Sequence, residues 1–327
     1  MIYKDRIYGT IQIENTILLE LIATPSLQRL KGIDQSGYFE PYFPGTSHSR
    51  FEHSLGVCIL LIKFGAPLEE QIAGLIHDVS HPVFSHCIDY ALDEGSETEH
   101  NFQDKMFEDF IKKSEIPKIL EKHKINLDYI LDENNFPLKE RPLPDLCADR
   151  IDYSLRTAVV FKEITQLDAI KFIDNLVIIK KNWVFKDKKI AKSYAELFKK
   201  INTLYYSGPP TAAMFRTVGD VIKYAMEKSY INKNDIFSTD KEIIKKIRKF
   251  QEKDNKLRLL FRRMNGKIKF KLDENNYDAI VFCKSRIVDP LFKHDSSIKR
   301  LSEVDNNWAE IVKKESLPKK YFLKFGI

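Results

Sequence analysis

Hydrophobic positions along most of the chain repeat with helical spacing. The apolar run over residues 51–64 predicts one compact helix, and Gly65 is expected to end it because glycine readily takes the left-handed conformation found after helices. Pro67 suits the start of the next helix. We expect that helix to end near Ser80, because Pro82 keeps the residue before it out of the helical conformation.

Helical spacing recurs in several other segments. These are residues 16–32, broken at Pro25, and residues 103–123, 143–170, 190–206 and 211–229. Thr239 and Glu242 have the spacing of a capping box, in which both side chains bind backbone amides at the start of a helix, so a further helix is expected there.

Short segments have the pattern of strands. Residues 3–13 alternate weakly around Gly9, and in residues 176–187 two apolar runs flank KKN, so both segments predict hairpins. IKFKL at 268–272 and AIVFC at 279–283 also resemble strands. The pattern therefore predicts a mainly α fold with small β-hairpin elements and a mixed α/β C-terminal part.

Composition describes an ordinary globular chain. Of 327 residues, 43% are hydrophobic and 31% are charged, and the longest aliphatic run, VCILLI, is too short to cross a bilayer. The N-terminus lacks the pattern of a signal peptide. The four cysteines lie far apart without a CxxC pair, so we expect reduced thiols and a cytoplasmic location with no membrane association.

The net charge of +6 is unevenly distributed. Residues 241–271 carry thirteen Lys and Arg against three Asp and Glu, about +10, and the remainder of the chain sums to about −4. Such a segment can bind phosphates or nucleic acid. A solvated, lysine-rich helix face is the favoured interpretation, so nucleic acid is a possible partner but not the preferred one.

Histidines concentrate in one stretch of the chain. GLIHDVSHPVFSH at 74–86 holds three of the eight histidines. His53, His77, Asp78 and Asp149 together offer two imidazoles and two carboxylates, ligands that Mn, Fe, Zn, Ni or Mg accept. His77 and Asp78 are expected near a helix end, where adjacent side chains can converge. Taken alone, His77 is better explained as a histidine packed in the core than as a metal ligand.

The order H…HD…D resembles the signature of the HD superfamily of metal-dependent phosphohydrolases. YFPGTSHSRFEHSLGV at 42–57, HDVSHPVFSH at 77–86 and ADRIDYSLR at 148–156 resemble the branch of deoxynucleoside triphosphate triphosphohydrolases, and KSRIVDPLF at 284–292 resembles a late strand of it. The motifs cover about residues 1–160. This resemblance implies an HD-domain helical bundle at 1–165, with an α+β region at 166–327 that completes the substrate pocket.

The resemblance also implies roles for individual residues. His53, His77, Asp78 and Asp149 would bind one divalent metal ion. His86, Asp89 and His100 would carry out the proton chemistry. His86 and Asp89 are three residues apart, and a carboxylate beside His86 is expected to raise its pKa and make it a proton donor near neutrality. Asn101 follows His100 where the branch usually has Glu.

Further positions resemble the branch's substrate-binding residues. Arg50 matches an arginine that contacts the α-phosphate, Gln35 a residue near the sugar 3′-hydroxyl, and Tyr153 a tyrosine near the phosphates or sugar. His81 is expected to line the phosphate pocket. Arg150 stands where the branch usually has Lys. For Arg150 and Arg156 a salt bridge on a helix surface is the alternative.

The resemblance weakens over residues 203–220, where GPP breaks the helix and Arg216 is the one basic residue nearby. Tyr205 and Tyr206 could stack on a base or fill the core. The first hypothesis is hydrolysis of a deoxynucleoside triphosphate to deoxynucleoside and triphosphate. The second keeps the metal site but changes the substrate to a nucleoside monophosphate, cyclic nucleotide or alarmone. The third is a binding module. A homo-oligomer with a regulatory nucleotide is also expected.

Overall fold

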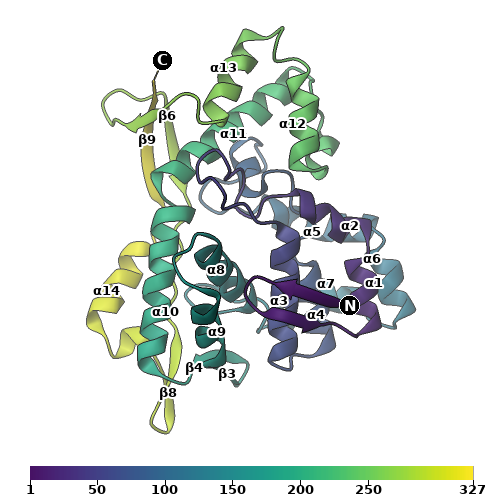
Figure 1. The fold of residues 1–327 in the computed structure, drawn as a ribbon, viewed down its shortest axis with the longest axis vertical. Helices are drawn as coiled ribbons and strands as arrows, with labels where there is room; N and C mark the ends of the chain where they lie inside the picture. The colour runs from purple at the N-terminus through teal and green to yellow at the C-terminus, as the bar shows by residue number, and fades with distance from the viewer. Residues whose placement is uncertain (327) are drawn as a thin grey trace.

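The computed structural model describes residues 1–326 and has the mainly α architecture predicted from the sequence (Figure 1). Its α-helices are α1 (Thr16–Ile22), α2 (Pro25–Arg29), α3 (Arg50–Lys63), α4 (Leu68–Ile76), α5 (Phe102–Lys113), α6 (Ile116–Lys122), α7 (Leu127–Leu131), α8 (Ala148–Val160), α9 (Gln166–Asp174), α10 (Lys188–Ile201), α11 (Pro209–Glu227), α12 (Asp240–Arg248), α13 (Asn255–Met264) and α14 (Asn306–Glu315). Short 3-10 helices are η1 (Leu30–Gly32), η2 (Ser85–Tyr90), η3 (Glu133–Asn135), η5 (Lys233–Phe237) and η6 (Leu301–Glu303), and η4 (Asn202–Tyr206) is a π-helical turn.

The strands form three small sheets. They are β1 (Ile2–Asp5) with β2 (Gly9–Gln12); the order β3 (Leu176–Ile179), β4 (Asn182–Phe185), β7 (Leu291–His294), β8 (Ser297–Arg300); and the order β5 (Phe270–Leu272), β9 (Lys319–Phe325), β6 (Ala279–Cys283). Both predicted hairpins are present, β1 with β2 and β3 with β4. Strand β9, near the C-terminus, lies between β5 and β6 and pairs antiparallel with both.

Local signals determine where several helices begin and end. Ser49 and Glu52 form a capping box at the start of α3. Gly65 has φ +69° directly after the C-cap of that helix, as predicted. Helix α4 ends at Ile76, four residues before the predicted Ser80. The ring nitrogen Nδ1 of His77 lies 2.8 Å from the carbonyl oxygen of Gly74, where the next helical N–H would otherwise bind.

Two other predicted helices are divided. Residues 103–123 form α5 and α6, since Pro117 has no N–H with which to continue the first helix. Residues 143–170 form α8 and the start of α9, which is capped by Thr165 and Asp168. The capping box of Thr239 and Glu242 starts α12 as predicted.

Three hydrophobic clusters make up the core, and two of them draw residues from both the N-terminal and the C-terminal halves of the chain. One of these contains Ile7 of the first hairpin, Val57 of α3 and both tryptophans, Trp183 and Trp308. The division at residue 165 therefore stays a prediction. All four cysteines are buried and unpaired.

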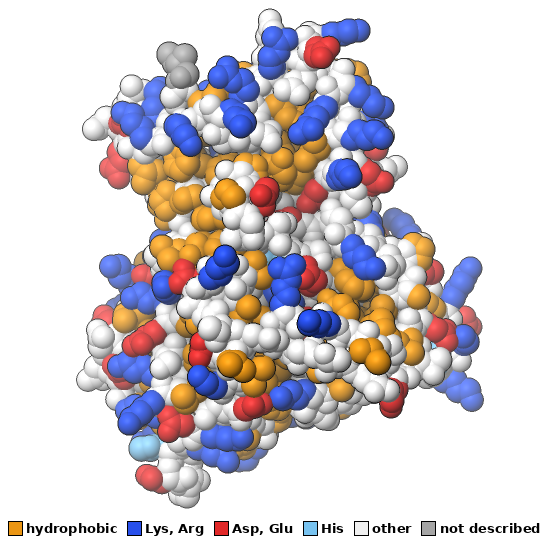
Figure 2. All heavy atoms as spheres, in the orientation of Figure 1, with side chains coloured by type: hydrophobic (Ala, Val, Ile, Leu, Met, Phe, Trp, Pro, Cys, Tyr) orange, Lys and Arg blue, Asp and Glu red, His pale blue; other side chains and the backbone are white. Residues whose placement is uncertain are grey.

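The surface of the molecule is uneven in charge. Figure 2 shows Lys and Arg side chains gathered over the top of the molecule, where Figure 1 places α12 and α13. Residues 1–326 contain no helix that is both long and apolar enough to cross a membrane.

Candidate metal centre and its cavity

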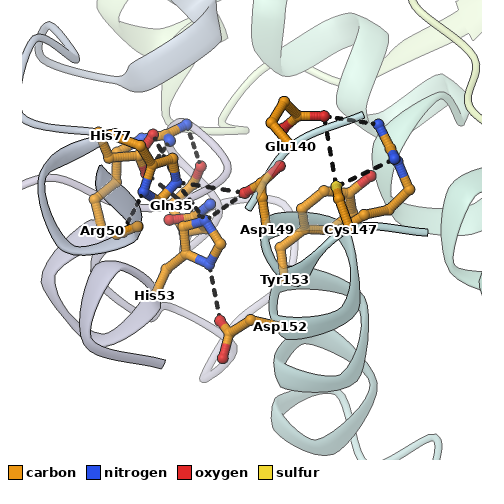
Figure 3. A network of polar contacts seen from close by, with 12 residues as sticks. Gln35, Arg50, His53, His77, Glu140, Cys147, Asp149, Asp152 and Tyr153 are labelled. Carbon is orange, nitrogen blue, oxygen red and sulfur yellow. Dashed lines mark hydrogen bonds and ion pairs between the residues drawn. The ribbon is translucent and has the colours of Figure 1, made fainter. Parts of the chain in front are cut away.

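Three of the four predicted metal ligands converge on one point (Figure 3). His53 lies on α3, His77 directly follows α4, and Asp149 lies in the first turn of α8. His53 Nε2 is 2.8 Å from Asp149 Oδ1 and 3.2 Å from His77 Nε2, and His77 Nε2 is 3.4 Å from the same Asp149 oxygen. One ligand atom from each residue lies within 4.8 Å of the others, which is the spacing of a shared cation site.

The ring orientations of the two histidines suit a cation. His53 Nδ1 lies 2.8 Å from Asp152 Oδ1, and His77 Nδ1 lies 2.8 Å from the carbonyl oxygen of Gly74. These acceptors place the proton of each neutral ring on Nδ1, so the two Nε2 lone pairs face one another and Asp149. Burial opposes a charge on His53, but Asp149 and Asp152 outweigh it and raise its pKa to about 9. The donor set therefore fits a divalent metal ion.

Asp78, the fourth predicted ligand, lies at the edge of this group. Its carboxylate oxygens are 3.5 Å from His77 Nε2 and 3.9 Å from His53 Nε2. Asp78 Oδ2 also accepts a hydrogen bond from Arg50 Nη1 at 2.6 Å. Burial works against ionisation, but Arg50 and the two histidines outweigh it and lower the pKa of Asp78. Asp78 is an ionised carboxylate shared between the cation site and Arg50.

A buried hydrogen-bond network holds the Nδ1 side of the His53 ring, and it was not predicted from the sequence. Asp152 accepts hydrogen bonds from two of the three Arg156 side-chain nitrogens, Nε at 3.0 Å and Nη2 at 2.8 Å, and from the Tyr8 hydroxyl at 2.9 Å. Arg156 Nη1 reaches Asp5 at 3.0 Å, which ties the N-terminal hairpin to the network. The spacing of Asp152 three residues after Asp149 could have indicated it, because residues at i and i+3 share a helix face.

The alternative of a surface salt bridge for Arg156 is wrong, because its side chain is completely buried. Gly56 makes room for this network. A Cβ atom there would lie 2.0 Å from Asp152 Oδ2 and 2.2 Å from Arg156 Nη2, so no larger residue fits without displacing the ion pair.

The predicted proton-transfer residues form a second cluster. The rings of His86 and His100 stack with centroids 4.9 Å apart. His86 Nδ1 lies 3.5 Å from Asp89 Oδ2, and His100 Nε2 lies 2.9 Å from the Tyr90 hydroxyl. Asp89 Oδ1 accepts the backbone N–H groups of residues 96 and 102, so the carboxylate is anchored beside the rings.

The expectation that Asp89 raises the pKa of His86 is wrong for this state of the protein. Burial lowers the pKa of His86 well below its usual value, and the nearby charges of Arg50, Arg286 and Lys284 lower it further. The 3.5 Å separation from Asp89 is too long for a strong hydrogen bond. An anion placed beside these three cations would reverse their effect, because it favours the protonated imidazole.

Both clusters open into one cavity of about 740 Å³. Its lining includes the predicted substrate residues Gln35, Arg50, His81, Arg150 and Tyr153. Gln35 Oε1 and His81 Nδ1 are buried without a hydrogen-bond partner among the described residues. His81 Nε2 lies 3.3 Å from Asp78 Oδ1.

Tyr205 and Tyr206 also line the cavity. The hydroxyl of Tyr205 donates to Glu163, and that of Tyr206 donates to Thr157 at 2.8 Å. Both rings are only partly buried. They are therefore held at the cavity wall with aromatic surface available, and the prediction that they stack on a base stays open.

The two arginines predicted to bind substrate differ in their surroundings. Arg50 donates to Asp78, to Ser85 Oγ at 2.7 Å and to the carbonyl oxygen of Gln35 at 2.9 Å. Three of its five N–H groups are used, so two are left for a ligand. The guanidinium of Arg150 binds its own neighbours: it donates to Glu140 at 3.3 Å, to Cys147 Sγ at 3.2 Å, and to the carbonyl oxygens of Arg141 and Asp145.

Those contacts hold the loop before α8, and they give Arg150 a structural reason to be present. Glu140, Cys147 and Asp149 also have the spacing of a second group of ligand atoms. The Arg150 guanidinium donates hydrogen bonds to two of these three residues, Glu140 and Cys147. This group therefore already has a positive charge beside it.

Comparison with known proteins agrees with this geometry. Residues 50–157 match the family model of the HD domain. The chain is 34% identical over 299 residues to the uncharacterized protein YdhJ of Bacillus subtilis, and the match covers 90% of both. It is 34% identical over 233 residues to the metal-dependent phosphohydrolase cns2 of Cordyceps militaris, covering 69% of this chain and 67% of that protein.

Other relatives share a part of the chain or the fold alone. Human deoxynucleoside triphosphate triphosphohydrolase SAMHD1 is 37% identical over 142 residues, which is 37% of this chain and 22% of that protein. A phosphohydrolase from Bacteroides thetaiotaomicron has the same fold over the whole of both chains, with a TM-score of 0.74 at 18% identity. The matched segment contains all four predicted metal ligands, and the chain belongs to the HD-domain family of metal-dependent phosphohydrolases.

Proposed function

We propose that this phosphohydrolase converts deoxynucleoside triphosphates to deoxynucleoside and triphosphate by attack of water at the α-phosphorus. One observation carries the proposal. The cation site of His53, His77 and Asp149 and the histidine pair of His86 and His100 open into the same cavity. A phosphoester placed between them meets a site for positive charge on one side and proton donors on the other.

The residues of the cation site and of the cavity would have separate roles in this reaction. A divalent ion held by His53, His77, Asp78 and Asp149 would supply Lewis-acid polarisation of the phosphoryl group and of water. Arg50 would hold the α-phosphate with its two unused N–H groups. The bond between the α-phosphorus and the 5′-oxygen breaks, and His86, with Asp89 and His100 beside it, would protonate that oxygen as it leaves.

A second candidate keeps the site and changes the substrate. Arg216, the basic residue of the 203–220 segment, pairs with Asp220 at 2.9 Å and does not line the cavity. That segment supplies no cation for outer phosphates, which favours a substrate with fewer phosphates, such as a nucleoside monophosphate or a cyclic nucleotide. A homo-oligomer, a regulatory nucleotide and a cytoplasmic location complete the proposal.

Analysis of the reaction products tests the proposed function against the second candidate. The metal-loaded chain is incubated with each of the four deoxynucleoside triphosphates, with monophosphates and with cyclic nucleotides, and the products are separated by ion-exchange chromatography. We expect deoxynucleoside and inorganic triphosphate in equal amounts. Release of orthophosphate from a monophosphate, with every triphosphate left intact, would support the second candidate instead. An Asp149→Asn variant serves as the inactive control.

A further inference from the structure

Six cationic side chains line the cavity, and four of them are already paired with carboxylates. The pairs are Arg50 with Asp78 at 2.6 Å, Lys139 with Glu133 at 2.7 Å, Arg141 with Asp145 at 3.7 Å, and Arg150 with Glu140 at 3.3 Å. The other two are Lys284 and Arg286. Within residues 1–326 neither has a carboxylate at ion-pair distance. These two cations are therefore the ones in the cavity whose charge is not neutralised.

Both side chains are partly buried, so water alone does not fully solvate the two charges that lack a carboxylate partner. Lys284 Nζ donates one hydrogen bond, to the carbonyl oxygen of Glu99 at 2.6 Å. The guanidinium of Arg286 makes no hydrogen bond to another described residue. Removing a cation from water is costly unless an anion or several acceptors replace the water. An anionic ligand would supply what the protein does not.

The backbone of residues 284–286 is held so that these two side chains face the cavity together. Asn202, a fully buried residue of the π-helical turn η4, binds this segment twice. Its Nδ2 donates to Ser285 Oγ at 3.0 Å, and its Oδ1 accepts the Arg286 N–H at 2.9 Å. Ser285 Oγ also donates to the carbonyl oxygen of Glu315 at 2.7 Å, so Ser285 points into the protein. Its neighbours on either side, Lys284 and Arg286, both line the cavity.

Lys284 and Arg286 line the same cavity as His86 and His100. The charges of Lys284 and Arg286 both lower the pKa values of His86 and His100, after the larger effect of burial. If the α-phosphate binds near Arg50 and His86, the phosphates that follow it lie within reach of this second pair of cations.

We infer that Lys284 and Arg286 form a binding site for the outer phosphates of a nucleoside polyphosphate. This inference rests on the proposed function and selects the polyphosphate substrate over the monophosphate. Residues 203–220 supply no cation to the cavity, because Arg216 pairs with Asp220 and does not line it. The charges come instead from residues 284–286, which Asn202 holds in position.

The test is the binding of inorganic triphosphate and of orthophosphate to the metal-loaded full-length chain, measured by isothermal titration calorimetry in buffer without free metal. We expect Arg286→Gln and Lys284→Gln each to weaken triphosphate binding about tenfold to one-hundredfold, the range of a charge-assisted hydrogen bond. Orthophosphate binding, which needs only the inner site, should change less than about threefold. Arg286→Lys should recover part of the loss.

Matched controls come from cations outside the cavity. Arg262 and Lys293 are exposed and do not line it, so Arg262→Gln and Lys293→Gln should leave both affinities unchanged. Unfolding temperature and metal content, measured before and after titration, show whether a variant has kept its fold and its ion.

The outcomes separate this inference from the proposed function. Unchanged triphosphate affinity in both glutamine variants, or equal losses for triphosphate and orthophosphate, would overturn the inference. Failure of the wild-type chain to hydrolyse any deoxynucleoside triphosphate would contradict the proposed function, and the titrations would still decide the inference. With hydrolysis present, kcat/KM for the triphosphate should fall in parallel with affinity, while turnover of bis(p-nitrophenyl) phosphate, which has no outer phosphates, stays the same.

Discussion

His53 and Asp152 are joined by a hydrogen bond of 2.8 Å between Nδ1 and Oδ1, and both side chains are completely buried. The bond fixes which nitrogen of His53 faces the cation site. Asp152 lies one helical turn after Asp149 on α8, so the same helix supplies a proposed ligand and the group that orients another ligand. The position of α8 therefore controls two elements of the metal centre.

Replacing Asp152 with Asn should weaken metal binding about tenfold to one-hundredfold, because a carboxylate behind a liganding histidine orients the ring and raises its basicity. The same change leaves the buried Arg156 with one carboxylate partner, Asp5, and should destabilise the fold by about 3–5 kcal/mol. Metal affinity by calorimetry and stability by urea unfolding measure the two effects. Tyr8→Phe is the control. It removes one hydrogen bond to Asp152 and keeps both charges, so an equal loss of metal affinity there would contradict this role for the carboxylate.

Gly56→Ala should destabilise the protein by at least about 2 kcal/mol, because the added methyl group overlaps the ion pair of Asp152 and Arg156. Metal affinity should fall together with stability, since that ion pair supports His53. Gly74→Ala offers a comparison in the next helix. Its Cβ would lie 2.5 Å from Leu61 Cδ1, the end of a flexible side chain that can move, so its effect should be smaller. Urea unfolding curves of the two variants show which substitution lowers the free energy of unfolding more.

Much of the fold and of the inner site could be predicted because the signals are local. The capping box at Thr239, the break at Pro25 and the left-handed Gly65 each depend on a few neighbouring residues, and the structure has all three. The capping box that starts α3 was not predicted from the sequence, although Ser49 and Glu52 have the required spacing. This capping box depends only on two residues three positions apart, so the sequence alone could have predicted it.

What could not be predicted depends on contacts distant in the sequence. Strand β9 pairs with β5 and β6, each about forty or more residues earlier, and a short amphipathic segment does not reveal such partners. Lys284 and Arg286 were missed for the same reason: their sequence resembles a strand, and only the fold shows that Asn202 turns them toward the cavity. The pKa of His86 was predicted with the wrong sign, because burial in the folded chain lowers it and cations from distant segments lower it further.

Metal binding should stabilise the folded chain. The ion would replace the proton that His53, with its pKa raised to about 9, otherwise holds beside Asp149, and it would bind His77 as well. An ion that binds only the folded state adds about 2.7 kcal/mol when its concentration is one hundred times Kd. Differential scanning fluorimetry should show a higher unfolding temperature with Mn²⁺ than with EDTA. The shift should vanish in Asp149→Asn and persist in His100→Gln, and a persistent shift in Asp149→Asn would argue against this ligand.

Substitution of His86 should slow catalysis without removing the ion. His86 lies in the second histidine cluster and belongs to none of the ligand groups found in residues 1–326. His86→Gln is expected to lower kcat about one-hundredfold or more, the usual contribution of a general acid. Steady-state kinetics and elemental analysis are measured on the same preparation. Normal turnover with normal metal content would exclude His86 as the proton donor.

Triphosphate binding should weaken as pH rises through about 8. Burial, together with the charges of Arg286 and Arg150, lowers the pKa of Lys284 to about 8, although Glu99 and Asp104 oppose this shift. Bound phosphate favours the protonated amine, so the free protein must take up a proton on binding above pH 8, and affinity then falls by up to about tenfold per pH unit. Calorimetry at pH 7 and pH 9 measures the change. Lys284→Arg keeps its charge, so it should show a flatter profile, and an identical profile in both proteins would rule out the lysine as the cause.

Asn202 suggests how enzymes of this kind could change the length of phosphate chain that they accept. Its side chain is sealed in the interior, yet it holds the backbone from which Lys284 and Arg286 project. Selection or engineering acting on that one amide could shift two charges at once while leaving the catalytic histidines in place. Substrate preference would then diverge among relatives through an interior residue that no inspection of the binding surface would reveal.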